Sequence, residues 1–238
     1  MLAYPIYFLK YFFWLLGKLK RRFGKGPETV VLTLSGDYSQ IPVPSPNFVV
    51  AYFKTPQISL FELGEQFRKV AADQQVKTVV LHIRPLVMPL AKLDILRGYI
   101  QDLQEAGKRV VAWSYQYDLG SYYLACGTDE IILLPGGEIG PLGIAREYIY
   151  LADALEKIGV QADFIQITPY KSAGDMFTQQ QMSDEVRQMG NWVAEATWEE
   201  IVNAIASGRG LDETTVKEIL DQTPCIDLEA KKLGLIDA

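Results

Sequence analysis

The first candidate for chemistry in this sequence is a lysine in the string PYKSAGDMF, which covers residues 169–177. Lys171 follows an expected strand and lies in a loop that leads into a helix. A lysine acts as a general base only when burial or a neighbouring cation lowers its pKa far below the usual value. Tyr170, Met176 and Phe177 offer apolar surroundings for such a base. Taken alone, the string is also compatible with an ordinary surface lysine.

Other reactive side chains are scarce in this chain of 238 residues. His82 is the single histidine, which excludes multi-histidine metal sites and leaves one possible Ser-His-Asp triad. It falls in an apolar, β-rich run, so we interpret it as a packing residue. Cys126 and Cys225 form at most one disulfide and do not have the spacing of zinc ligands. We therefore expect no metal site and no cofactor.

Charge is divided unevenly along the chain. Residues 1–26 hold six Lys or Arg and no Asp or Glu, so they carry +6; the whole chain carries −6, and the remainder therefore carries −12. An acidic body disfavours nucleic acid as a partner, because nucleic-acid binding needs a basic face. A basic and apolar terminus instead favours a membrane surface.

The N-terminal segment, residues 1–26, is expected to form a helix that associates with a membrane. Residues 2–16 are apolar apart from Lys10, and a basic cluster follows them. This apolar run is shorter than the ~20 residues of a spanning helix, and its order of charged and apolar residues is the reverse of that in a signal peptide. Its many aromatic residues fit a helix that lies in the headgroup region. A helix docked on the body and a free tail are the alternatives.

Residues 27–238 are expected to form one α/β domain with a largely parallel sheet. Apolar, β-branched runs predict strands, and segments with helical periodicity separate most of them. The Gly-rich string at 136–144 lacks the Lys and Ser/Thr of a phosphate-binding loop, so we expect a turn and hairpin there. Strands are expected at 28–36, 48–53, 77–84, 109–115, 130–135 and 161–168, and helices at 59–74, 91–106, 118–129, 147–158, 183–207 and 212–221.

Four strings that occur in order give the body a family resemblance. They are YDLGSYYLACGTDEI, GGEIGPLGI, PYKSAGDMF and a C-terminal stretch that contains GRGL and ends in AKKLGLIDA. Together they resemble the signal peptide peptidase A family of membrane-bound serine proteases, over residues 29–238. The resemblance implies the ClpP/crotonase fold, a spiral of ββα units, and a Ser nucleophile that is served by a Lys general base.

The resemblance assigns the general base to Lys171 but leaves the nucleophile position without a hydroxyl. Single-domain members place the serine in a stretch such as ASGGYY at the start of a helix. If Tyr122-Tyr123 set the register, its SGG residues align with Leu119, Gly120 and Ser121. Leu119 thus occupies the position of the serine. Ser121 is an alternative nucleophile, although it would lie on a different face of the helix. The candidate residues of the substrate groove are Tyr170, Ser172 and Gly120.

The backbone donors of the family's oxyanion hole are also missing. Single-domain members follow the strand before the nucleophile with a turn such as SPGG, whereas this chain has RPLVMPL at 84–90. Pro85 and Pro89 have no N–H to offer, and no glycine lies between Gly64 and Gly98. The loss of these donors also argues against a crotonase-like acyl-CoA enzyme. A lysine string without its serine resembles the N-terminal copy of the family's long, duplicated form, in which the C-terminal copy supplies the serine.

Two hypotheses follow from this pattern. The first is a domain that donates the lysine to a Ser/Lys endopeptidase, with the serine on another domain or chain and remnant signal peptides as substrates. The second is a catalytically inactive membrane scaffold or peptide-binding protein of the same fold. The resemblance further implies a homo-oligomer, a tetramer in the family, that is anchored at the cytoplasmic membrane with its catalytic body on the outer face.

Overall fold

The computed structural model describes residues 26–42, 58–165, 167 and 170–238. The helix expected at 1–26, apart from Gly26, and the strand expected at 48–53 lie outside these residues. The chain divides into two compact units. Unit 1 comprises the residues up to Gly140 together with Cys225–Ala238, and unit 2 comprises Pro141–Pro224. The chain therefore leaves unit 1 at Gly140 and returns to it at Cys225.

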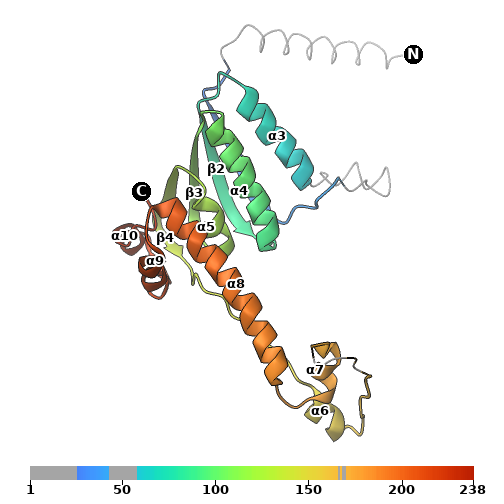
Figure 1. The fold of residues 1–238 in the computed structure, drawn as a ribbon. Helices are drawn as coiled ribbons and strands as arrows, with labels where there is room; N and C mark the ends of the chain where they lie inside the picture. The colour runs from blue at the N-terminus through green and yellow to red at the C-terminus, as the bar shows by residue number, and fades with distance from the viewer. Residues whose placement is uncertain (1–25, 43–57, 166, 168–169) are drawn as a thin grey trace, which may run out of the picture. The chain divides into compact units, whose positions relative to one another are not determined.

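Unit 1 is built on a five-stranded sheet with the order β1-β2-β3-β4-β5. The pairings from β1 to β4 are parallel, whereas the short β5 runs antiparallel to β4. Parallel neighbours need a crossover, and helices supply it from β1 to β4 (Figure 1). The prediction of an α/β class with a largely parallel sheet is confirmed. The strands are β1 Thr29–Gly36, β2 Thr78–Leu86, β3 Arg109–Tyr117, β4 Glu130–Ile139 and β5 Cys225–Ile226.

Alternation along the strands explains the core of unit 1. In β2, Val79, Leu81 and Ile83 are fully buried, whereas the residues between them are partly exposed. Successive side chains of a strand point to opposite faces, so these three residues share one face of the sheet. The helices of unit 1 are α3 Leu60–Ala72, α4 Leu90–Glu105, α5 Leu119–Ala125 and α10 Asp227–Lys232.

The opposite face of β2 carries the single histidine. His82 stacks on Trp113 of β3, with ring centroids 4.0 Å apart and an angle of 9° between the ring planes. The two residues are also direct partners in the parallel pairing of β2 and β3. The interpretation of His82 as a packing residue is confirmed.

Unit 2 contains helices and extended segments, with no strand among its described residues. Its longest helix is α8 Asp184–Arg209, which the Ser183 side chain caps at its start. Gly210 ends α8 with a left-handed φ of 65°, a conformation that glycine adopts without steric cost. The other helical elements are α6 Ala152–Lys157, the 3₁₀ turn η1 Ser172–Gly174, α7 Asp175–Thr178 and α9 Glu213–Leu220. None of the helices in the described ranges is long and apolar enough to cross a membrane.

The prediction of a turn and hairpin at 136–144 is wrong. Residues up to Ile139 continue β4, after a register shift that leaves extra residues in β4 opposite Tyr115. Gly136 has a φ of 79°, and a Cβ at Gly137 would lie 2.6 Å from the carbonyl oxygen of Tyr115. The two glycines therefore allow a bulge within the strand rather than a reversal of the chain.

The prediction of a strand at 161–168 is also wrong for the residues that the structure describes, 161–165 and 167. Phe164 stacks on Phe177 instead, with ring centroids 6.0 Å apart. Ile165 and Ile167 are 99% and 89% exposed. The alternating apolar residues thus have no neighbouring strand among the described residues of unit 2 that they could join.

Candidate functional site

Lys171 lies in unit 2, immediately before η1 and α7. Its side chain is exposed to solvent in the described chain. Tyr170 is anchored beside it, because the Tyr170 hydroxyl donates a 3.4 Å hydrogen bond to Oε1 of Gln188 on α8. Ser172 is half-buried at the first position of η1. Three of the predicted site residues therefore share one loop of unit 2.

A small residue and aromatic packing hold the turn that follows Lys171. Gly174 is buried, and a Cβ at this position would lie 2.8 Å from a ring carbon of Phe164. The backbone N–H of Leu151 donates a 2.7 Å hydrogen bond to the carbonyl of Met176, which ties α7 to the start of α6. The glycine of the PYKSAGDMF string thus has a packing role, because a larger residue would displace Phe164.

Leu119, Gly120 and Ser121 lie in unit 1, at the start of α5. Ser121 is only 2% exposed and forms a capping box with Asp118. Its Oγ accepts a 2.8 Å hydrogen bond from the Asp118 amide and donates a 2.7 Å hydrogen bond to Oδ1 of Asp118. The hydroxyl therefore has a structural task. The signal for this task is the spacing D-x-x-S before an apolar run, which our sequence reasoning missed.

The segment at 84–90 follows ordinary strand and helix geometry. Pro85 lies within β2, and Pro89 is the N-cap residue of α4. The backbone N–H of Val87 donates a 3.0 Å hydrogen bond to the carbonyl of Gly36 at the end of β1. This donor is therefore engaged within the sheet rather than directed at a substrate.

A cation and a carboxylate lie beside this end of the sheet. Nζ of Lys92 donates hydrogen bonds of 2.6 Å to Oδ1 of Asp37 and 2.8 Å to the carbonyl of Tyr38. The hydrogen bond from Lys92 holds the pKa of the Asp37 carboxyl below its usual value. The pair joins the end of β1 to the first turn of α4, and we assign it a structural role.

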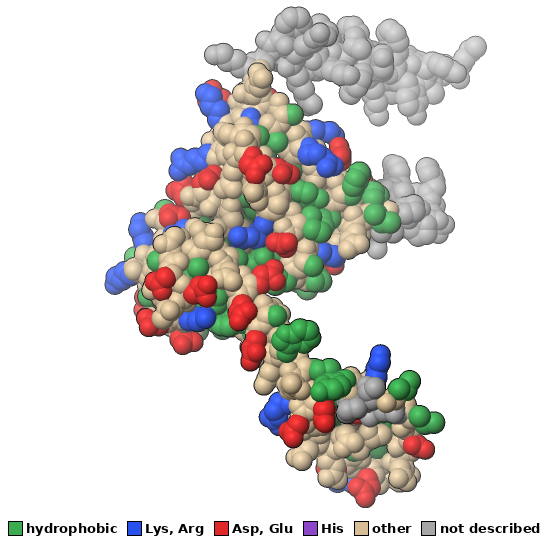
Figure 2. Space-filling view, in the orientation of Figure 1, with side chains coloured by type: hydrophobic (Ala, Val, Ile, Leu, Met, Phe, Trp, Pro, Cys, Tyr) green, Lys and Arg blue, Asp and Glu red, His purple; other side chains and the backbone are tan. Residues whose placement is uncertain are grey.

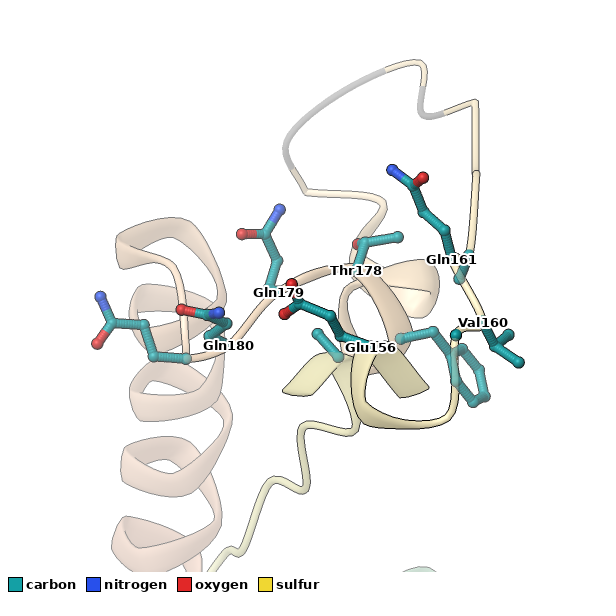
Figure 3. Close-up of a pocket in the computed structure, with 11 residues that line it drawn as sticks. Glu156, Val160, Gln161, Thr178, Gln179 and Gln180 are labelled. Carbon is teal, nitrogen blue, oxygen red and sulfur yellow. The ribbon is translucent and has the colours of Figure 1, made fainter. Parts of the chain in front are cut away.

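A hollow of about 830 Å³ lies in unit 2 beside α6 and the segment after α7 (Figure 3). Glu156 is the one ionisable side chain in its lining, and Lys171 does not line it. The Thr178 hydroxyl in the same lining donates a 3.2 Å hydrogen bond to the carbonyl of Gly174. Among the residues described here, this hollow therefore holds no paired base and nucleophile. Most of its remaining polar lining comes from Gln161, Gln179, Gln180 and Gln181.

Many large apolar side chains reach the surface of unit 2 (Figure 2). Ile165 and Ile167, which precede Lys171, are almost fully exposed, and Trp192 on α8 is 72% exposed. Extended apolar surface of this kind commonly marks a site of interaction. Further exposed members are Tyr148, Ile149, Ile158, Val160, Phe164, Tyr170, Met176 and Val193.

The loop that contains Lys171 and the start of α5 both lie in the part of the chain that matches a family of peptidases in sequence. Residues 102–238 match the sequence model described as peptidase family S49. Because the match covers more than half of the chain, the protein belongs to peptidase family S49. The names of curated relatives agree with the resemblance to signal peptide peptidase A.

Two curated relatives show how much of such a protein this chain represents. "Serine protease SPPA, chloroplastic" of Arabidopsis thaliana is 27% identical over 179 residues, which cover 75% of this chain and 26% of the relative. "Protease 4" of Haemophilus influenzae is 30% identical over 162 residues, which cover 67% of this chain and 26% of the relative. The chain thus spans about a quarter of the length of these relatives.

Structural comparison gives weaker likenesses. A mutant of the 1510-N membrane-bound stomatin-specific protease aligns with a TM-score of 0.45 and 13% identity, covering 88% of this chain and 77% of that one. A likeness of this size does not define the fold. The ClpP/crotonase spiral of ββα units therefore stays a prediction.

Proposed function

We propose that this chain supplies the general-base lysine of a Ser/Lys endopeptidase whose nucleophilic serine lies on another domain or chain. One observation supports the proposal: in a member of peptidase family S49, the string around Lys171 is intact, whereas the family resemblance puts Leu119 at the position expected for the serine. Leucine has no nucleophilic atom. The two curated relatives described above are about four times as long as the part that matches this chain, so they have room for a serine-bearing copy.

In this scheme Lys171 performs the proton transfers that histidine performs in a triad. Its neutral amine accepts the proton of the serine hydroxyl as the serine oxygen attacks the scissile carbonyl, and the proton then passes to the leaving amine. A lysine amine is neutral near pH 7 only in apolar surroundings or beside another cation. Because Lys171 is exposed in the described chain, a partner would have to cover it. Exposed Ile165 and Ile167 offer apolar surface for that contact.

The substrates that we propose are remnant signal peptides or other apolar segments released from a membrane. The basic and apolar residues 1–26, of which 1–25 lie outside the described part, would keep the chain at the cytoplasmic membrane. A homo-oligomer or a serine-bearing partner would bring the lysine to the serine. Placement of the catalytic body on the outer face rests on the family resemblance alone.

Substitution of the lysine tests this proposal in the complete assembly from the native source. We expect Lys171→Ala to lower cleavage of a quenched fluorescent apolar peptide by about 1,000-fold, within the range for loss of a general base. Lys157→Ala, which removes another exposed lysine of unit 2, is the matched control and should retain full activity. Full proteolysis by the Lys171→Ala assembly would end the proposal.

A second function is favoured by the same gap at the nucleophile position. Leu119 carries no hydroxyl, and the nearby Ser121 is engaged in capping α5. A catalytically inactive scaffold that binds apolar peptides would show these features. It predicts peptide binding without turnover, so lysine-dependent turnover by the native assembly would reject it.

A further inference from the structure

A groove along α8 in unit 2 combines an apolar part with two arginines. A hollow of about 350 Å³ is lined by Gly143, Ile144, Ala194 and Trp198, with Glu195 as its one charged residue. A second hollow of about 280 Å³ shares Ile144 and Ala194 and extends to Arg146 and Arg187. Because the two hollows share lining residues, they form one continuous surface, which we name the α8 groove. One end is mainly apolar with Glu195 in its lining, and the other end is basic.

The arginines of the α8 groove are not neutralised within the described chain. Neither guanidinium forms an ion pair or a hydrogen bond with another described residue. A guanidinium presents several N–H donors in one plane, an arrangement that matches the two oxygens of a carboxylate. Tyr148 and Asn191 add a hydroxyl and an amide to the lining at this end. No acidic side chain lines the hollow that contains the two arginines.

The position of Arg187 adds to the positive potential at this end. Arg187 lies near the start of the 26-residue α8, where the helix dipole favours negative charge. Asp184 and Glu185 in the first turn oppose this field, but neither lines the groove. The guanidiniums therefore remain the charged groups that a ligand in the basic hollow would meet.

Gly190 explains how Tyr148 approaches the helix. A Cβ at Gly190 would lie 2.7 Å from the Tyr148 hydroxyl oxygen. Glycine inside a helix is less favourable than alanine, so its place in α8 needs a structural reason. The close approach of Tyr148 provides that reason and fixes one wall of the α8 groove.

We propose that the α8 groove binds the C-terminal end of an apolar peptide. The free carboxylate of the peptide lies against Arg146 and Arg187, and its last side chains contact Ile144, Ala194 and Trp198. Charge complementarity selects this occupant, because an apolar chain that ends in one negative charge matches a groove with one mainly apolar and one basic end. An internal segment of a polypeptide lacks the carboxylate and satisfies only the apolar end.

The proposal deepens the proposed function and rests on it, since a peptidase for released apolar segments meets peptides with free C-termini. The lysine loop and the basic end of the groove are attached to the same part of α8. Tyr170, beside Lys171, donates its hydrogen bond to Gln188, which is the next residue after Arg187. A peptide end held at the arginines would therefore lie on the same part of α8 to which the candidate general base is tied.

The binding test uses the full chain and one apolar peptide in two forms, as a free acid and as a C-terminal amide. The probe is a short Leu/Ala peptide with an N-terminal fluorophore, and the readout is fluorescence anisotropy. We expect the acid to bind about tenfold more tightly than the amide, because its carboxylate meets two guanidiniums. We expect Arg146→Gln and Arg187→Gln each to remove most of this preference without weakening binding of the amide. Both arginine side chains are exposed, so neither substitution disturbs the core.

Controls separate this proposal from its alternatives. Lys157→Gln makes the same change of charge elsewhere in unit 2 and should leave both affinities unchanged, whereas Trp198→Ala should weaken both. Equal affinities for acid and amide, or a preference that survives both arginine substitutions, would overturn the proposal. The proposal would also be overturned if laurate displaced the acid peptide and bound with equal affinity, because the groove would then bind anionic amphiphiles in general.

Failure of the groove proposal and failure of the proposed catalytic role give different results. Loss of the acid preference in a chain whose assembly still shows lysine-dependent cleavage would reject the groove alone. An arginine-dependent acid preference in a chain whose Lys171→Ala assembly keeps full activity would reject the catalytic proposal and support the groove as a binding site for peptide ends.

Discussion

Ser121 shows how a hydroxyl can stand close to the expected nucleophile position and still have another task. Its Oγ exchanges hydrogen bonds with the backbone and side chain of Asp118, and the residue is 2% exposed. A nucleophilic hydroxyl needs access to substrate and a base that can take its proton. The surroundings of Ser121 therefore fit a role in helix capping better than a role in catalysis.

Replacement of this serine separates the two tasks. We expect Ser121→Ala to lower the free energy of unfolding by about 1 kcal/mol, because the Asp118 amide loses its partner in the capping box. Cleavage by the complete assembly should stay unchanged when it is corrected for the folded fraction. Chemical denaturation and peptide cleavage are measured on the same preparations, with Asp118→Ala as the matched disruption of the box. A folded Ser121→Ala assembly without activity would instead make Ser121 the nucleophile.

The sequence predicts candidate site residues from local strings, but it does not predict their contacts. The PYKSAGDMF string predicts Lys171 as the general base, and the double tyrosine sets the register that would bring Leu119 to the serine position; both assignments stay predictions. The engagement of the Val87 amide with Gly36 depends on the alignment of two strands, and no local pattern reports it. The shared groove of Arg146 and Arg187 is equally non-local, because the two residues are far apart in the chain.

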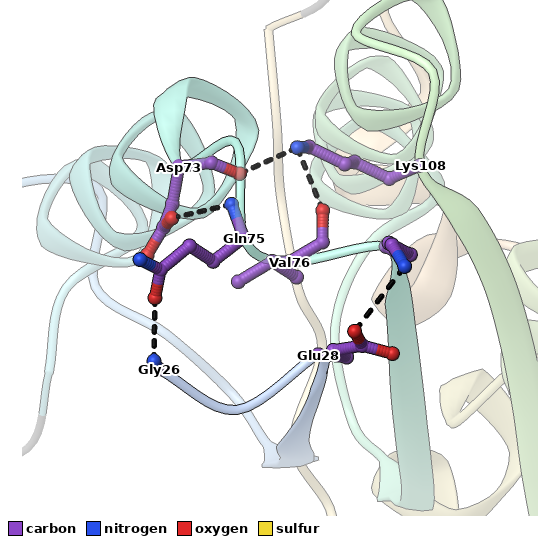
Figure 4. Close-up of polar contacts among 7 residues, drawn as sticks. Gly26, Glu28, Asp73, Gln75, Val76 and Lys108 are labelled. Carbon is purple, nitrogen blue, oxygen red and sulfur yellow. Dashed lines mark hydrogen bonds and ion pairs between the residues drawn. The ribbon is translucent and has the colours of Figure 1, made fainter. Parts of the chain in front are cut away.

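At the scale of elements, Lys108 joins the end of α3 to the start of β3 (Figure 4). Its Nζ donates hydrogen bonds of 2.6 Å to the carbonyl of Asp73 and 2.8 Å to the carbonyl of Val76. The residue is 8% exposed. A cation near the C-terminus of a helix bonds the last carbonyls and complements the helix dipole.

Removal of this ammonium tests how much the junction contributes to stability. We expect Lys108→Met to lower the free energy of unfolding by about 2 kcal/mol, because two carbonyls lose a charged donor while the aliphatic stem is kept. Lys77 forms an exposed 3.2 Å ion pair with Glu28 at the same end of the sheet. Lys77→Met should therefore cost less than about 0.5 kcal/mol. Equal shifts of the two denaturation midpoints would contradict a special role for Lys108.

Elements with regular apolar spacing followed from the sequence, whereas two irregular ones did not. The strand expected at 77–84 and the helix expected at 91–106 correspond to β2 and α4 with bounds that differ by at most two residues. The apolar alternation at 161–168 serves an aromatic stack within unit 2 rather than a sheet. The glycines at 136–137 form a bulge that depends on the carbonyl of Tyr115, so its geometry is set by another strand.

At the scale of the whole molecule, unit 1 is assembled from two separate stretches of the chain. Residues Cys225–Ala238 return after unit 2 and pair along β4. The backbone N–H of Leu133 donates a 2.8 Å hydrogen bond to the carbonyl of Ala238, and that of Ile131 donates one of 2.8 Å to Oδ2 of Asp237. The string LGLIDA thus covers an edge of the sheet that would otherwise be exposed. Free backbone groups at such an edge attract other strands.

A hydrogen bond from α5 fixes the same segment. The buried Tyr122 hydroxyl donates a 2.7 Å hydrogen bond to the carbonyl of Leu235. We expect Tyr122→Phe to lower the free energy of unfolding by about 1 kcal/mol, since the ring is retained and one buried carbonyl loses a donor. Tyr115→Phe, at a position that is 46% exposed, should have little effect and serves as the control in thermal unfolding. Equal losses in the two variants would show that the bond to Leu235 contributes nothing.

The return of the chain to β4 has a consequence for synthesis on the ribosome. Strands β1 to β4 leave the exit tunnel before unit 2, and Cys225–Ala238 leaves it only afterwards. During that interval the edge of β4 is uncovered, and an uncovered edge can pair with strands of neighbouring nascent chains. Chaperone binding would be most useful in this interval, and completion of the first unit depends on translation of the second.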